Sequence, residues 1–153
     1  MRKQIAFLLA TWFGAGLSPA APGTMGSIAA LFFALPVYWL ELSPLLLLGA
    51  AALLLPIGIW ASGIYANETG ADDPGAVVID EVAGQWMVLA LAPLTPLGWL
   101  AAFALFRFFD ILKPWPVSWA DRTLDGGTGI MMDDILAGLY GMAAMALATH
   151  FLF

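Results

Sequence analysis

The sequence predicts an all-α protein, a polytopic bundle of about five membrane helices preceded by a short interfacial or re-entrant helix. Of its 153 residues, 62% are hydrophobic and only 10% are charged, and the mean hydropathy is +0.91. A soluble domain carries about 25% charged residues and cannot hide so much apolar surface, which makes lipid the expected solvent. The apolar residues also occur in runs that are separated by proline, glycine and polar residues. We expect residues 1–153 to form a single domain.

The bounds of each predicted helix are set by the two ends of an apolar run. The first run, Ile5–Phe13, is too short to cross a bilayer core of about 30 Å, and it fits an interfacial or re-entrant helix better than a cleavable signal. The membrane helices are predicted at Ser27–Leu40, Pro44–Ala66, Val82–Ala92, Leu97–Leu112 and Ile135–Phe153. Proline and polar residues between these runs end the helices. Because several runs are short, we expect the helices to extend past their apolar ends, for instance from Val82 back to Asp80.

The connections between these helices are of two kinds. Three are long and polar, at Gly14–Gly26, Asn67–Glu81 and Lys113–Asp134, whereas the other two are tight turns. When the five helices alternate in direction, every long connection falls on one face of the membrane. All five Lys and Arg residues lie on that face, so the positive-inside rule places it in the cytoplasm.

Several classes of function are excluded by composition. The formal charge is −6 with only five Lys and Arg residues, which argues against a nucleic-acid partner. The chain has no cysteine, which excludes disulfides, thiolate metal sites and cysteine nucleophiles. The sole histidine, His150, is predicted on the face opposite the polar connections, so histidine-based phosphatase chemistry is also excluded.

The acidic residues are concentrated at helix ends on the predicted cytoplasmic face. Two adjacent pairs each open an apolar helix and a fifth acid ends another: Asp80-Glu81, Asp133-Asp134 and Asp110. Helix capping explains one acid at such a position but does not readily explain two. Crowded carboxylates repel one another and favour a divalent cation, and an all-oxygen ligand set favours Mg²⁺, Mn²⁺ or Ca²⁺ over Zn²⁺. Asp72 and Asp73, beside Pro74 and Gly75, are expected to be solvated loop residues.

Basic residues lie near these acids in the sequence. Arg107 and Asp110 are three residues apart and share a helix face, and Lys113 follows before a proline. The row is consistent with an interfacial ion pair in which Lys113 reaches the head groups, or with a phosphate clamp that Arg122 would complete.

Two glycine-rich stretches are further candidates for binding an anion. The stretch Gly126–Gly129 is predicted to be a loop with exposed backbone amides. The loop before residue 27 precedes a helix whose N-terminus would be capped by Thr24 or Ser27 and would form an anion site. A well-capped connector without a function is the alternative for this second stretch.

Taken together, these motifs resemble the phosphatidylglycerophosphatase A family. The strings that carry the resemblance are APGTMGS (Ala21–Ser27), IDEVAG (Ile79–Gly84), FRFFDILKPWP (Phe106–Pro116), ADR (Ala120–Arg122) and GGTGIMMDD (Gly126–Asp134). The resemblance implies Mg²⁺-dependent hydrolysis of phosphatidylglycerophosphate to phosphatidylglycerol and phosphate, at the cytoplasmic face of a bacterial inner membrane. The substrate is then a phospholipid that remains in the bilayer.

With that activity in mind, we assign roles to the candidate residues. The acids Asp80, Glu81, Asp133 and Asp134 are expected to hold one or two Mg²⁺ ions, with Asp110 as a further catalytic ligand or as the partner of Arg107. The substrate phosphate is expected to contact Arg107, Lys113, Arg122, Thr24 and Ser27. The nucleophile is left open between a water molecule and a carboxylate, and the oligomeric state is left open as well.

Two other classes of protein remain as alternatives. A cation transporter or channel component would use clustered carboxylates, but its acids are expected near mid-span rather than at helix ends. A non-catalytic membrane scaffold would have no reason to gather five acids with three bases.

Overall fold

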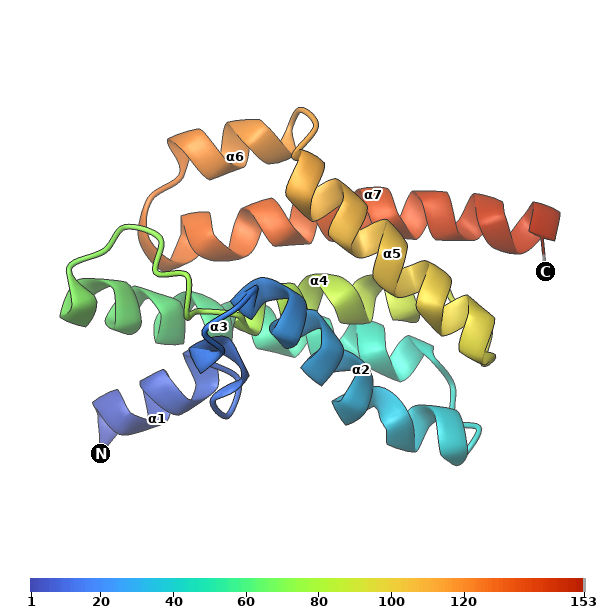
Figure 1. Cartoon of the computed structure of the whole chain (residues 1–153), viewed down its shortest axis with the longest axis horizontal. Helices are drawn as coiled ribbons and strands as arrows, with labels where there is room; N and C mark the ends of the chain where they lie inside the picture. Colours follow the sequence, from blue (N-terminus) through green and yellow to red (C-terminus); the bar gives the residue numbers. More distant parts are fainter. Residues whose placement is uncertain (153) are drawn as a thin grey trace.

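The computed structural model describes residues 1–152, which form seven α-helices and one short 3-10 helix and contain no strand. This confirms the all-α prediction (Figure 1). In chain order the elements are α1 (Arg2–Ala10), η1 (Ala15–Leu17), α2 (Pro22–Trp39), α3 (Leu45–Thr69), α4 (Ile79–Leu89), α5 (Pro96–Leu112), α6 (Val117–Thr123) and α7 (Gly126–Leu152).

Helix α4 is the centre of the bundle. Every residue of α4 except Glu81 is buried, and the helix packs against α2, α3, α5 and α7. Small residues allow the close approach of α7, since a Cβ at Gly138 or Gly141 would meet Met87 or Val88 of α4. These two glycines therefore serve helix packing.

The number of membrane-spanning helices is smaller than predicted. By length and apolar composition, two helices among the described residues could cross a membrane: Leu45–Thr69, with a mean hydropathy of 2.1, and Gly126–Phe151, with 1.4. Helices α4 and α5 have 11 and 17 residues, which corresponds to about 16 and 25 Å at 1.5 Å per residue. About five spans are expected from the sequence because each apolar run after the first is read as a crossing. The predicted end of the last run, Phe153, lies outside the described residues.

The polar connections gather at one end of the molecule. The connections from α3 to α4 and from α6 to α7 lie at the left of Figure 1, whereas the turn from α2 to α3 and the start of α5 lie at the right. The short helix α1 packs on α3, where the Phe7 and Tyr65 ring centroids are 4.4 Å apart. The backbone N–H of Val78 donates to the carbonyl of Ala10 at 2.8 Å, which links α1 to the segment that leads into α4.

Three local predictions are wrong. The predicted polar loop Lys113–Asp134 contains the helix α6, whose buried Val117 and Ala120 are too few to form a visible apolar run. The predicted loop Gly126–Gly129 is the first turn of α7. Helix α2 begins at Pro22, a residue whose fixed φ suits the first helical position. It therefore starts earlier than expected, and neither Thr24 nor Ser27 is its cap.

Candidate functional site

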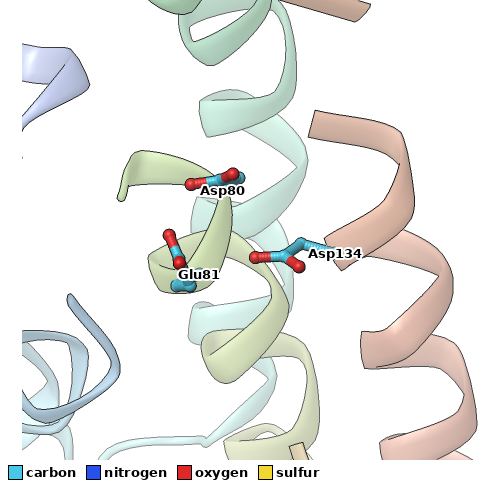
Figure 2. Close-up of side chains that lie close together, drawn as sticks. All are labelled: Asp80, Glu81 and Asp134. Atoms are coloured by element: carbon cyan, nitrogen blue, oxygen red, sulfur yellow. The ribbon is translucent and has the colours of Figure 1, made fainter. Parts of the chain in front are cut away.

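The structure brings three of the predicted acids into one cluster (Figure 2). Asp80 and Glu81 belong to the first turn of α4 and Asp134 to α7, and one carboxylate oxygen from each lies within 4.8 Å of the others. Asp80 is 8% exposed and Asp134 is 3% exposed. The cluster is thus formed by residues far apart in the sequence and lies largely out of contact with solvent.

A close contact between α4 and α7 sets this geometry. A Cβ on Gly84 would lie 2.7 Å from the carbonyl oxygen of Asp134 and would also meet the Phe106 ring. Only glycine therefore allows α7 to approach α4 at this level, one turn beyond Asp80 and Glu81. The approach places the Asp134 carboxylate opposite the first turn of α4.

Burial makes the ionised forms of these acids unfavourable. Burial is the main cause that raises the pKa of Asp80 well above its usual range, and the nearby charges of Glu81 and Asp134 raise it further. Burial also raises the pKa of Glu81, against hydrogen bonding with Asp80, which lowers it. Holding all three carboxylates ionised therefore requires a compensating positive charge.

The unpartnered atoms of the cluster fit a divalent cation. Asp80 Oδ1, Glu81 Oε2 and Asp134 Oδ2 are all buried, and none has a hydrogen-bond partner among the described residues. Buried polar atoms in native proteins are nearly always paired. Three anionic oxygens converging from three side chains are the donor set that a hard cation such as Mg²⁺ prefers.

The cluster faces a cavity of about 510 Å³ at the ends of four helices. The lining residues are Ala21, Pro22, Gly23, Thr24, Asp73, Gly75, Val77, Asp80, Glu81, Arg107, Asp110, Ile111, Lys113, Asp133 and Asp134. Carboxylates, two cations and the first turn of α2 therefore share one cavity. The expectation that Asp73 is only a solvated loop residue is incomplete, because it is exposed and yet lines this cavity.

Arg107 lies beside the carboxylate cluster and has free hydrogen-bonding capacity. Its Nη1 forms an ion pair with Asp110 on the next turn of α5. Its Nε is buried and has no partner among the described residues. A Cβ at Gly23, in the first turn of α2, would clash with Glu81 and would lie 3.3 Å from Arg107 Nη1, so α2, α4 and α5 meet closely at this point.

Lys113 joins α5 to α6 and α7. Its Nζ donates to Asp133 Oδ2 at 2.6 Å and also to Asp121 of α6. Burial alone would lower the pKa of Lys113, but the bonds to Asp121 and Asp133 outweigh it and raise that pKa above its usual value. Lys113 therefore links α5 to α6 and α7 through charge-assisted hydrogen bonds, and it also forms part of the cavity wall.

Only some of the other predicted site residues lie at the cavity. Thr24 and Asp133 line the cavity, although Asp133 is bound by Lys113 and lies outside the three-carboxylate cluster. Ser27 is fully buried and does not line the cavity. Arg122 is exposed on α6 and is not part of the cavity wall. His150 lies in the last turns of α7.

Sequence reasoning missed two residues near the site. Asp121 was passed over, although the string ADR contains it, because nothing in the sequence indicates that it meets Lys113. Gln85 is fully buried, and neither of its amide atoms has a partner among the residues described. A polar residue inside an apolar run, one helical turn after Glu81, was the signal that could have marked it.

Together, the fold and the site define a helical protein with two apolar helices long enough to cross a membrane. Its carboxylate cluster could bind a cation, and the arginine and lysine beside it could bind a phosphate. The chain belongs to the phosphatidylglycerophosphatase A family, whose family model matches residues 8–149. This confirms the resemblance seen in the sequence motifs, and it identifies the class of enzyme.

Individual relatives agree with the family match. The chain is 42% identical to phosphatidylglycerophosphatase A of Escherichia coli K12, over 94% of this chain and 83% of that protein. It is 43% identical to the protein of the same name from Haemophilus influenzae, over 88% and 83%. It is also 42% identical to a Bacteroides thetaiotaomicron protein named "Putative phosphatidylinositol-3-phosphatase", over 92% and 91%. No solved structure matches the chain.

Proposed function

We propose that this chain hydrolyses phosphatidylglycerophosphate to phosphatidylglycerol and phosphate, as a phosphatase of phospholipid biosynthesis. The observation that carries the proposal is the cavity in which Asp80, Glu81 and Asp134 face Arg107 and Lys113. Anionic ligands for a metal and cationic ligands for a phosphate are the two halves of a phosphomonoester site. The identity to two proteins named phosphatidylglycerophosphatase A supports the choice of substrate.

We further propose that the enzyme requires Mg²⁺, held by Asp80, Glu81 and Asp134. Bound there, the ion would supply a Lewis acid that polarises the phosphoryl group. The three unpartnered carboxylate oxygens support this assignment. Asp133 stays a predicted ligand, but its hydrogen bond with Lys113 favours a role in holding the cavity wall.

The phosphate is expected to bind between Arg107 and the start of α2. The buried Nε–H of Arg107 has no partner within the described part of the chain, and a guanidinium offers planar, charge-assisted hydrogen bonds to phosphate oxygens. Gly23 and Thr24 line the same cavity within the first turn of α2, where helix N–H groups and the helix dipole attract anions. Lys113 adds positive charge at the wall. These groups orient the substrate and offset its charge.

The location proposed for this enzyme is the bacterial inner membrane, crossed several times, with the cavity open to the cytoplasm. Large apolar side chains on the outer surface support lipid contact, since Phe32, Leu53 and Ile111 are 67%, 69% and 70% exposed. The collection of the polar connections at one end supports a single polar face. Helices shorter than the bilayer core would require local thinning of the bilayer or a shallow position of the bundle.

The test is phosphate release by the purified protein in detergent, with Mg²⁺ and with EDTA, from phosphatidylglycerophosphate and from phosphatidylinositol 3-phosphate. We expect Mg²⁺-dependent release, faster from phosphatidylglycerophosphate. Asp134→Asn should reduce it about a hundredfold or more, because an ion of this kind contributes several kcal/mol to the transition state. Asp72→Asn, an exposed acid outside the cavity wall, is the control and should retain activity.

The outcomes separate the alternatives. Absence of release from both lipids by well-folded protein would reject the phosphatase and lead to cation-flux assays for a transporter. Preference for phosphatidylinositol 3-phosphate would keep the enzyme class and change the substrate.

A further inference from the structure

We propose that an exposed apolar stripe on α5 carries the acyl chains of the lipid substrate, and that the head group enters the cavity sideways past Ile111. The proposal rests on the proposed function, because it concerns how the lipid reaches that site. The occupant of the stripe is the diacyl part of one phospholipid.

The stripe consists of residues at helical spacing on the outer face of α5. Leu97, Leu100, Phe108 and Ile111 are 64%, 62%, 56% and 70% exposed, and Ala104 between them is exposed as well. Spacings of three and four residues place all five on one face of a helix. Arg107 also falls on this face, three residues after Ala104, but its side chain is only 15% exposed. The exposed side chains of the face are therefore all apolar and suit hydrocarbon rather than water. We call these five residues the α5 stripe.

The α5 stripe is continuous with the cavity. Ile111 belongs to the stripe and also lines the cavity, beside Asp110 and one turn from Arg107. Helix α2, on another side of the cavity, contributes only Pro22–Thr24 to the wall, and its exposed apolar residues begin with Met25, which is not in the wall. Among the described residues, α5 is therefore the helix whose exposed large apolar surface leads into the cavity.

The length of the stripe suits a lipid in one leaflet. From Leu97 to Ile111 the helix rises about 21 Å at 1.5 Å per residue. Half of a bilayer core is about 15 Å thick. A lipid with its phosphate near Arg107 therefore finds apolar surface along its whole chain length, with its chains still in the bilayer.

Aromatic residues mark the level of the head groups at the cavity end of the stripe. Trp115 and Trp119 follow α5 directly and are 76% and 50% exposed. Tyr140 Oη of α7 donates to the carbonyl of Trp115 at 2.8 Å, which holds this segment against the bundle. Tryptophan favours the membrane interface because it combines an apolar ring with a polar N–H. The boundary between acyl chains and head groups thus falls beside Ile111.

The experiment compares a long-chain and a short-chain substrate. Ile111→Ser and Phe108→Ser would be assayed with dipalmitoyl phosphatidylglycerophosphate in mixed micelles and with its water-soluble dihexanoyl analogue. We expect KM for the long-chain lipid to rise about tenfold, because each variant removes one apolar contact with the acyl chains. For Phe108→Ser, which lies outside the cavity wall, the kcat and KM for the short-chain substrate should stay near wild type.

Two further variants test whether the effect on KM is specific to the α5 stripe. Leu53→Ser on α3 removes a side chain that is 69% exposed, similar to Ile111 but away from the cavity, and it should leave KM unchanged. Ile28→Ser tests α2 as the rival path. All four substitutions are at exposed positions, and melting temperatures in the same detergent verify folding.

Three results would overturn the proposal. The first is an unchanged KM for the long-chain lipid in both stripe variants. The second is a larger rise of that KM in Ile28→Ser than in the stripe variants. The third is an equal rise of KM for the two substrates, which would mean that Ile111 shapes the cavity rather than binding acyl chains. Failure of the wild-type protein to release phosphate from either substrate would instead reject the proposed function itself.

Discussion

At the scale of single residues, the site combines two opposing requirements. Asp80, Glu81 and Asp134 are placed where burial and mutual repulsion disfavour their charged forms. The same arrangement brings one carboxylate oxygen of each residue within 4.8 Å of the others, and each side chain has a buried oxygen without a partner among the described residues. Ionising all three acids without a compensating charge is therefore unfavourable, and a divalent cation bound there would offset the repulsion.

Asp80→Asn is predicted to stabilise the metal-free protein at neutral pH. An acid whose pKa is raised in the folded state stabilises that state most at low pH. The stabilisation is lost as the pH rises from the pKa of the unfolded chain, about 3.9, through the raised pKa of the folded protein. The melting temperature of the variant in EDTA should exceed that of wild type at pH 7 to 8, and the difference should shrink as the pH is lowered. A lower melting temperature at pH 8 would contradict this account.

Gly84→Ala is predicted to lower both stability and activity. The new Cβ would overlap the Phe106 ring and lie 2.7 Å from the Asp134 carbonyl oxygen, which forces α7 away from α4. We expect a loss of about 1–3 kcal/mol in unfolding free energy, the usual cost of overpacking. Gly49→Ala is the control, because its Cβ would meet nothing within 4 Å. Equal stability of the two variants in thermal unfolding would disprove the close-packing explanation.

At the scale of secondary structure, one cation holds a short helix in place. Helix α6 has only seven residues and buries Val117 and Ala120, so its own apolar contacts are few. Lys113 links Asp121 of α6 to Asp133 of α7. The α6 segment, which also carries Trp119, is thereby fixed beside the cavity.

Lys113→Met is predicted to loosen α6 and to destabilise the protein by about 1–3 kcal/mol, because Asp133 is left buried without its partner. The raised pKa of Lys113 means that the interaction is fully present at neutral pH and is lost only as pH rises past the usual lysine value. The double variant Lys113→Met/Asp133→Asn should recover part of the loss. Strict additivity in this double-mutant cycle would show that the two residues do not interact.

At the scale of the whole molecule, the proposed metal site and the proposed membrane orientation both concern the bundle as one unit. The carboxylate cluster joins α4 to α7, so an ion bound there would stabilise the tertiary structure rather than one helix. The proposed orientation would place the cavity on the side that carries the Lys and Arg residues.

Mg²⁺ is predicted to raise the melting temperature of wild type but not of Asp134→Asn. At a concentration one hundred times Kd, a ligand that binds only the folded state contributes about 2.7 kcal/mol. Differential scanning fluorimetry in detergent, with Mg²⁺ and with EDTA, measures the shift. The cluster would not be a metal site if both proteins responded alike.

The orientation is tested by labelling, because the chain has no native cysteine. Glu41→Cys and Arg122→Cys place single thiols at exposed positions on opposite ends of the predicted topology. In intact cells with a permeabilised outer membrane, a membrane-impermeant maleimide should label position 41 and not position 122. The reverse pattern would place the cavity outside the cytoplasm, and labelling of both would contradict a fixed orientation.

The sequence by itself determined the helical class, the family and the acids that are available to a site. Long apolar runs, few charges and acids at the ends of those runs are local properties, and the motifs from Ala21 to Asp134 already pointed to the family that the comparisons show.

Only the tertiary structure decided which acids meet and where helices begin. Asp133 and Asp134 are equivalent in sequence, yet one step along a helix turns a side chain by about 100°. The packing of α7 on Gly84 therefore sends Asp134 to the cluster and Asp133 to Lys113. Helix α6 and the early start of α7 escaped prediction because they depend on tertiary packing that no local pattern shows. Lys113 binds Asp121 of α6, and Gly127 of α7 packs closely on Ile59 of α3. Local patterns record which residues are available, whereas the rotation and contact of packed helices decide which of them act together.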